Sequence, residues 1–497
     1  MSGSEAPGRD PSEWPPVGEL ARGLRDGRWS SRDLLRAVRE RVERTDHLFA
    51  AVRGLDPGAE RAAEESDGRL AAGEARGPLE GIPVLVKDNI DVSGLPTTAG
   101  ALALAAARPE GDAHLVARLR QAGAVVAGKT NLSELANFLT EDMPSGYSSL
   151  GGQVLNPYDL ALTPSGSSSG SASAVALGLV PLAVGTETDG SITSPCAHQS
   201  LVGVKPTLGL VSRHGIVPIA PSQDTAGPMA RTVADAAALL AAMAGSDRRD
   251  PATGPADDVA DRLARSTPDP ASLGGTRLAV ARGGPAERDP DLAAAYQAAL
   301  AALAGAAAGS IEWRVPEADE ADDADELFVL HYEFAPAMDL YLASLAEPAP
   351  IRSMRELRDW NRAHPGPALK YGQMHVDRAL AMDHDARRDE YAGARARDAA
   401  AARDMLQGAL DSADADAVVF PAEDGATWAA RAGWPCVALP AGYRDRSRRP
   451  AAVTVVGRPW SDDRLLSLAA GMERVLPARR PPWEINPAVF RRFTDGR

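Results

Sequence analysis

Apolar and polar positions along the chain form two recurring patterns. In the stretches 20–45 and 233–244 apolar residues recur at helical spacing, which predicts amphipathic helices, the first with a cap and first turn at 30–33. A further helix is expected to begin at 133–138. Short runs of consecutive apolar residues at 82–86, 124–127 and 180–184 predict buried strands. Because helices and short apolar strands alternate, the pattern indicates a layered α/β fold.

The patterns also differ between regions of the chain. Residues 1–15 are polar and rich in proline, and we expect a flexible N-terminal tail there. The stretch 163–230 is dense in glycine and serine but interleaved with apolar runs, which predicts packed core with tight turns rather than a linker. An acidic, proline-rich stretch at 245–272 predicts a surface excursion, and 326–411 is predicted to be mostly helical.

Composition excludes several classes of protein. The formal net charge of −15 argues against a nucleic-acid-binding surface. No apolar run approaches the ~18 residues of a membrane-spanning helix, and no signal-peptide pattern opens the chain. The two cysteines, Cys196 and Cys436, do not form a disulfide framework. We therefore expect a cytoplasmic protein without nucleic-acid or membrane partners, and the sequence leaves a homodimer open.

Lysine is rare in this chain. Of the 53 basic residues only four are lysines, at positions 87, 129, 205 and 370. Arginine fills most positions where a generic positive charge is enough. A buried lysine can lose its proton and an arginine in practice cannot, so a retained lysine is a candidate for a role that needs a neutral amine. Chance retention is the alternative for any single lysine.

One motif suggests nucleotide binding but lacks the required context. The residues from Gly123 to Thr130 match the phosphate-binding pattern G-x-x-x-x-G-K-T. That motif needs a strand before its first glycine and a loop across its middle. Here a helical pattern precedes Gly123, and 124–127 is itself predicted as a strand. Nucleotide binding is therefore only the distant alternative.

Two serine-bearing turns stand out in the glycine-rich region. Ser167 lies in the block 163–171, and Ser191 follows the end of a predicted strand. Glycine beside a serine lets the backbone approach a substrate closely, and successive N–H groups in such a turn can converge on an oxyanion. Lys87 ends another predicted strand, so these side chains could supply a nucleophile, a relay and a base. On composition alone, a flexible Ser/Gly loop is the alternative.

These segments resemble the amidase signature family. The block 166–195 is similar to the signature itself, and Gly-Ile-Pro-Val-Leu-Val-Lys-Asp-Asn at 81–89 is similar to the lysine strand of that family. The resemblance covers about residues 17–485. It implies a single-domain α/β/α sandwich with a mixed, twisted central sheet over 16–497, in which the substrate-pocket region at about 245–430 is variable. Further segments that match in order are 128–134, 203–207, 224–235 and 456–460.

The resemblance implies a Ser-Ser-Lys triad. Ser191 is the expected nucleophile that forms an acyl-enzyme, Ser167 the expected relay in a cis peptide bond, and Lys87 the expected neutral base. Ser168 is expected to hold Lys87 by a hydrogen bond. No metal or organic cofactor is implied. The backbone N–H groups expected to form the oxyanion hole are those of Thr188, Asp189, Gly190 and Ser191.

Two departures from the family pattern concern the substrate site. Thr193 stands where the family usually has an arginine that pairs with the acidic residue matching Glu187. The segment 420–433 is shorter than the pocket-covering loop of relatives, which predicts a more open or reshaped pocket. Trp428 in this segment is a candidate for the substrate entrance, with core packing as the alternative. The sequence around Ser191 resembles the branch that contains peptide amidases.

The implied activity is hydrolysis of a carboxamide, small or peptidic, to a carboxylate and ammonia or an amine. Biosynthetic acyl transfer, and the amidase subunit of a tRNA-dependent amidotransferase, are the alternatives within the family. Cys196 is expected to be a small buried thiol rather than a reactive one. Residues with metal-ligand chemistry that we expect on a solvated face instead are His375, Asp377, Asp383 and His384.

Overall fold

The computed structural model describes residues 14–316 and 320–494. Most of its strands join one eleven-stranded sheet. In chain order these strands are β1 (Val52–Leu55), β2 (Pro83–Lys87), β3 (Val125–Thr130), β6 (Leu182–Glu187), β7 (Val202–Lys205), β8 (Thr225–Ala230), β9 (Arg277–Arg282), β10 (Gly309–Arg314), β11 (Ala417–Pro421), β12 (Cys436–Tyr443) and β13 (Pro450–Val456).

The sheet is mixed, as predicted. Its strand order is β1-β3-β2-β6-β8-β7-β12-β13-β11-β9-β10. β2 is parallel to both β3 and β6, and β9 is parallel to both β10 and β11. The other neighbouring strands are antiparallel. A separate small hairpin consists of β4 (Tyr147–Ser148) and β5 (Gly152–Gln153).

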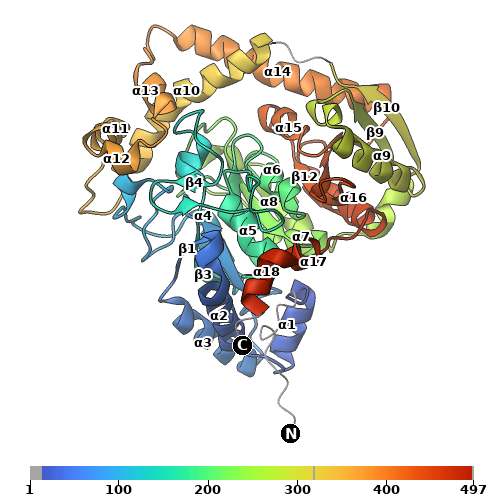
Figure 1. Cartoon of the computed structure of the whole chain (residues 1–497), viewed down its shortest axis with the longest axis horizontal. Helices are drawn as coiled ribbons and strands as arrows, with labels where there is room; N and C mark the ends of the chain where they lie inside the picture. Colours follow the sequence, from blue (N-terminus) through green and yellow to red (C-terminus); the bar gives the residue numbers. More distant parts are fainter. Residues whose placement is uncertain (1–13, 317–319, 495–497) are drawn as a thin grey trace.

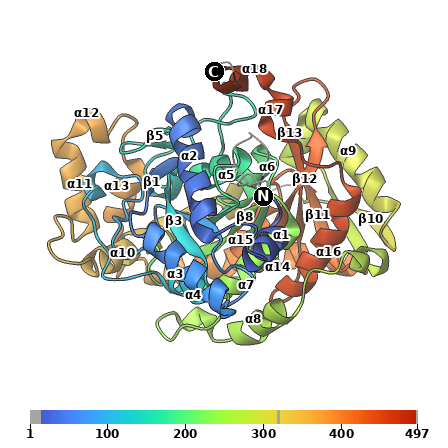
Figure 2. The same ribbon diagram turned by 90° about the horizontal axis from the view of Figure 1, so that it is seen from below.

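Helices surround this sheet, which Figure 2 shows running across the molecule. They are α1 (Val17–Arg25), α2 (Ser31–Phe49), α3 (Ala59–Ala72), α4 (His114–Gln121), α5 (Ser169–Ala176), α6 (Thr193–His198), α7 (Val233–Met243), α8 (Ala256–Arg265), α9 (Pro290–Ala304), α10 (Glu320–Ala343), α11 (Met354–Ala363), α12 (Pro365–Ala368), α13 (Met374–Leu380), α14 (Arg388–Ser412), α15 (Ala426–Ala432), α16 (Asp462–Val475), α17 (Pro482–Ile485) and α18 (Pro487–Thr494).

Consecutive residues of β11 show which helices cover each face of the sheet. Val418 and Phe420 belong to an apolar cluster with α14 and α15, whereas Val419 between them belongs to a cluster with α9 and α16. Consecutive residues of a strand point to opposite faces of the sheet. The two pairs of helices therefore cover opposite faces, and the predicted α/β/α sandwich is confirmed.

The region 326–411 is helical, as predicted. Figure 1 shows α10 and α14 lying across the top of the molecule, away from α1 to α3. Phe334 and Met338 of α10, Leu357 of α11 and Val376 of α13 form an apolar cluster of their own with loops that follow β2 and β3. This helical layer is thus packed against the loops at one edge of the sheet.

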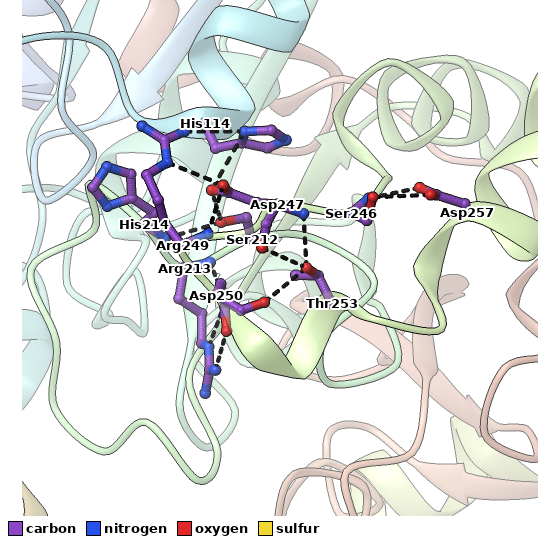
Figure 3. A network of polar contacts seen from close by, with 10 residues as sticks. All are labelled: His114, Ser212, Arg213, His214, Ser246, Asp247, Arg249, Asp250, Thr253 and Asp257. Atoms are coloured by element: carbon purple, nitrogen blue, oxygen red, sulfur yellow. Dashed lines mark hydrogen bonds and ion pairs between the residues drawn. The ribbon is translucent and has the colours of Figure 1, made fainter.

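The segment 245–272 has many exposed residues but is anchored to the rest of the protein at several buried positions. Helix α8 within it buries an apolar face. The loop before α8 is fixed by the polar network in Figure 3, in which Ser212 donates to Asp247 at 2.8 Å and Arg213 Nε donates to Asp250 at 2.8 Å. Asp247 and Asp250 are thus buried, whereas Asp257, Asp258 and Asp261 on α8 are exposed.

The N-terminal region forms two helices where the pattern predicted one over 20–45. Ser30 between them makes the predicted cap: its hydroxyl accepts from the Asp33 N–H and its own N–H donates to the Asp33 carboxylate, both at 3.0 Å. Of the predicted tail, residues 1–13 lie outside the described residues. Trp14 is buried, and its indole donates to the Gly178 carbonyl at 2.8 Å.

Some elements did not follow from the pattern. The strands β1, β7, β8 and β10 are short and interrupted by glycine, proline or charged residues, so they carry no apolar run. The helix expected to begin at 133–138 is only a short 3₁₀ turn, in which Leu135 and Ala136 have φ of 48° and 55°. Within the described ranges, none of the helices has the length and hydropathy needed to cross a membrane.

Candidate active site

Two parallel strands bring the candidate residues together. Lys87 is the last residue of β2, and Thr186 and Glu187 end β6. β2 and β6 pair side by side with Val86 opposite Val184, so their carboxyl ends lie at the same edge of the sheet. The serine-bearing turns before α5 and α6 are at this edge as well, because their backbone and side chains bond to the end of β6 and to each other.

The Lys87 amine is fully buried and makes three hydrogen bonds. Nζ donates to the Ser167 hydroxyl at 2.7 Å, to the Thr186 hydroxyl at 2.9 Å and to the Thr186 carbonyl at 3.3 Å. The Asn89 side-chain amide donates to the same Thr186 hydroxyl at 2.9 Å. Thr186 was not singled out in the sequence. Its position at the end of β6, before the turn that carries Ser191, could have indicated that it lies at the site.

Burial controls the charge of this lysine. Removal from water lowers the pKa of Lys87 from its ordinary value of 10.5 to about 7, although the nearby carboxylates of Glu187 and Asp224 raise it. The desolvation effect dominates because Lys87 has no direct ion pair among the described residues, only hydroxyl and carbonyl acceptors. At neutral pH a large fraction of this amine is therefore unprotonated.

The two serine segments are bonded to each other. The Gly166–Ser167 peptide bond is cis, and the Ser167 carbonyl accepts from the Ser133 N–H at 3.1 Å. The Ser168 N–H donates to the Ser191 carbonyl at 3.1 Å. Both serine side chains at 167 and 168 are fully buried, while Ser191 retains 8 % exposure. The expected nucleophile is thus the more accessible of the three.

Ser168 reaches Lys87 indirectly, in contrast to the expected hydrogen bond. Its hydroxyl donates to the Thr186 carbonyl at 3.0 Å and accepts from the Thr186 N–H at 3.2 Å. Among the described contacts, the Lys87 amine bonds only Ser167 and Thr186. Ser168 therefore orients the end of β6, and Thr186 in turn orients the lysine.

The turn from Thr188 to Ser191 is held in place at both ends. Gly190 has φ of 70°, a conformation that favours glycine. The Thr188 hydroxyl donates to Asp224 at 2.5 Å, which fixes the start of the turn. The N–H of Ser194 donates to the Gly190 carbonyl at 2.7 Å, so a helical turn begins at once after the loop.

Glu187 supports this turn without the usual arginine. Its carboxylate accepts from the N–H groups of Ile192 and Thr193 at 2.7 and 2.9 Å, and from the Thr193 hydroxyl at 3.1 Å. Glu187 is 1 % exposed, and Thr193 is fully buried. The threonine that replaces the arginine thus bonds the same acidic residue directly.

The shortened segment 420–433 packs against the nucleophile turn. The Thr427 hydroxyl donates to the Asp189 carboxylate at 3.1 Å, and the Ser194 hydroxyl donates to Glu423 at 3.4 Å. Trp428 is partly exposed, and the Arg431 guanidinium lies 5.3 Å from the centre of its ring. This segment therefore contacts the residues on either side of Ser191, although Trp428 itself faces an arginine.

The phosphate-like motif is built into the sheet. Residues Val125–Thr130 are strand β3, buried throughout, and Lys129 Nζ lies 2.9 Å from the Asp88 carboxylate. A phosphate-binding loop needs free N–H groups and a free lysine, and this segment offers neither. Asp88 also accepts from Thr98, so the motif ties together the loops beside Lys87.

The remaining candidates are separate from this site. Cys196 is fully buried, burial raises its pKa well above the usual value, and both cysteines are free thiols. His375 is buried, stacked on Phe138 and 2.9 Å from His331 Nε2, so its prediction as part of a solvated face was wrong. Asp377 instead pairs with an arginine on α11 at 2.9 Å, and the His384 ring contacts the Tyr332 carbonyl at 2.8 Å.

Comparison with known proteins identifies the family. A family model described as Amidase matches residues 33–466, so the chain belongs to the amidase family. The crystal structure of a peptide amidase from Stenotrophomonas maltophilia is similar with a TM-score of 0.88 and 40% sequence identity, covering 94% of this chain and 98% of that one. The fold and the resemblance to the peptide amidase branch are thereby confirmed.

Two sequence relatives span nearly the whole chain. A probable amidase of Arabidopsis thaliana is 32% identical over 472 residues, which is 94% of this chain and 91% of the relative. A glutamyl-tRNA(Gln) amidotransferase subunit from Salinispora tropica is 35% identical over 510 residues, 93% of this chain and 98% of its own. The chain is a hydrolase that acts on amide C–N bonds.

Proposed function

We propose that the chain hydrolyses a carboxamide through an acyl-enzyme on Ser191, with Ser167 as proton relay and Lys87 as base. The observation that carries the proposal is the 2.7 Å hydrogen bond from the buried Lys87 amine to the Ser167 hydroxyl. A lysine whose pKa is about 7 can accept a proton at neutral pH. Because the Lys87 amine lies beside the Ser167 hydroxyl, it can exchange this proton with the serine.

In this mechanism the Ser191 hydroxyl attacks the amide carbon. Its proton passes to Ser167, whose own proton passes to Lys87. The N–H groups of the 188–191 turn stabilise the oxyanion. The proton then returns through Ser167 to the leaving nitrogen, the C–N bond breaks, and ammonia or an amine departs. Water attacks the acyl-enzyme ester by the same relay and releases the carboxylate, so the mechanism needs only groups of this chain and one water molecule.

The test has two parts. Ser191 should react with a fluorophosphonate probe, and peptide mapping should find the label on this residue. Purified protein should then release ammonia or amine from a panel of peptide, aryl and aliphatic amides. Peptide amides are the first choice because of the likeness to a peptide amidase. Absence of labelling at Ser191 together with inactivity on every amide would contradict the proposal.

A role within a tRNA-dependent amidotransferase is the second candidate, because a relative that carries this name aligns over nearly the whole chain. Such a role requires partner chains for the full reaction. Amide hydrolysis by the purified chain alone, unchanged by an added acyl acceptor, favours the hydrolase. Product formation that depends on an added amine acceptor favours acyl transfer.

A further inference from the structure

The segment between β11 and α15 places one carboxylate beside the nucleophile turn. Glu423 and His198 each retain 32% side-chain exposure, and the Ser194 hydroxyl donates to Glu423 at 3.4 Å. On the turn and helix after β6, Asp189, Gly190, Ser194 and His198 keep partial exposure, whereas the other residues of α6 are buried. Of these residues, Ser194 and His198 approach the Glu423 carboxylate.

Ser194 links Glu423 to both serine-bearing segments. Its N–H donates to the Gly190 carbonyl at 2.7 Å, so Ser194 lies one helical turn after the residue that precedes Ser191. Its hydroxyl is 2.7 Å from the hydroxyl of Ser165, two positions before Ser167. The Glu423 carboxylate is therefore separated from each segment by a single side chain.

The charge of Glu423 is not neutralised by a fixed cation. Among the described residues, no lysine or arginine forms an ion pair with it, and its nearest basic group is His198 Nδ1 at 3.8 Å. That nitrogen lies 3.0 Å from the Ser194 carbonyl, which can only accept, so Nδ1 donates its hydrogen bond to this carbonyl and not to Glu423. The adjacent Asp424 carboxyl is close enough to interact electrostatically with Glu423.

We propose that Glu423 is a specificity-determining residue that binds an ammonium or other cationic group of the substrate. The inference rests on the proposed function and deepens it: the preferred substrates are amides that carry a positive charge close to the scissile carboxamide. A partly exposed carboxylate with one hydroxyl donor retains free acceptor positions for such a group. A charge-assisted hydrogen bond of this kind favours the cationic substrate by about tenfold or more.

The test compares matched pairs of substrates. ω-Amino amides from glycinamide to 6-aminohexanamide are assayed against the amides in which a methyl group replaces the ammonium. The readout is the ratio of kcat/KM within each pair, which does not depend on the amount of active enzyme. Wild-type protein should prefer the cationic member by about tenfold at the best chain length.

Three variants sharpen the comparison. Glu423→Gln keeps the shape and the Ser194 hydrogen bond, and should lose most of the cationic preference. Glu423→Arg should reverse it, so that glutaramic acid, which carries a carboxylate, becomes the better substrate. Glu64→Gln makes the same chemical change at an exposed position on α3 and should leave the ratio as in wild type.

A labelling measurement gives an independent readout. Butylammonium should slow fluorophosphonate labelling of Ser191 more than butanol does, and Glu423→Gln should remove that difference. Equal kcat/KM within every pair, or a ratio that Glu423→Gln leaves unchanged, overturns the inference while the proposed function stands. Failure to hydrolyse any amide, together with absence of labelling at Ser191, overturns both.

Discussion

The Lys87 amine lies 2.7 Å from the Ser167 hydroxyl, and both side chains are sealed from solvent. Among the described residues, the lysine has two hydroxyl partners, Ser167 and Thr186, and no counter-ion in direct contact. Burial then favours the neutral amine. The same pair explains why a lysine stands here in a chain that otherwise uses arginine, since a guanidinium would remain charged.

Replacement of Lys87 tests the base directly. Lys87→Arg keeps a positive charge but cannot accept a proton at working pH, so kcat should fall by at least ~10²-fold, as for loss of a general base. Lys87→Ala should be about equally inactive. Circular dichroism and thermal unfolding verify that both variants are folded. Near-normal turnover by folded Lys87→Arg would defeat the triad assignment.

The pH dependence of kcat/KM follows from the pKa of the same residue. Burial lowers the pKa of Lys87 to about 7, and the base must be neutral. Activity should therefore be full above pH 7 and fall about tenfold per unit below it, as one proton binds. A kcat/KM profile that stays flat from pH 8 to below pH 6 would contradict a lysine base.

The two serines should differ in the size of their effects. Ser191→Ala removes the atom that attacks the substrate, so both turnover and fluorophosphonate labelling should be lost. Ser167→Ala removes a relay that water partly replaces, so it should lose less activity than Ser191→Ala and still become labelled, though more slowly. Equal losses in both readouts would argue against a relay role for Ser167.

Thr186 is a positioning residue that acts through Lys87. Thr186→Val removes the hydroxyl that accepts from Lys87 and Asn89. An ammonium donates more strongly than an amine, so loss of this acceptor should lower the pKa of Lys87 and move the acid limb of the pH profile down by about one unit. Thr186→Ser keeps the hydroxyl and should restore the limb. An unchanged limb in a less active valine variant would indicate a purely structural role.

Glu187 and Thr193 should contribute unequally to the nucleophile turn. Thr193→Val removes one of three donors to Glu187 and should cost about 1 kcal/mol of stability with a small loss in kcat. Glu187→Gln weakens the two backbone bonds as well, and should lower kcat further. Thermal unfolding and steady-state kinetics measure both effects. A larger loss from Thr193→Val than from Glu187→Gln would contradict this arrangement.

The features that the sequence predicted correctly depend on residues that are close together in the chain. The short apolar run before Lys87 predicted the strand that places it, because consecutive buried residues followed by a polar residue are typical of a strand end. The glycine-rich turns around Ser167 and Ser191 were likewise legible, since their backbone geometry depends on residues that adjoin them. The cap at Ser30 depends only on the residue three positions later, and it also formed as predicted.

The sequence by itself determined the family, the layered fold and the three residues of the candidate triad, because each follows from short motifs in a fixed order. Only the tertiary structure decided which groups meet across the sheet: Thr186 beside Lys87, 99 positions away, and Glu423 beside Ser194, 229 positions away. The tertiary structure likewise decided the strands without apolar runs, β1, β7, β8 and β10, and the burial of Asp247 and Asp250 before α8. Their environments depend on residues distant in the chain, and a local pattern of polarity does not identify such residues.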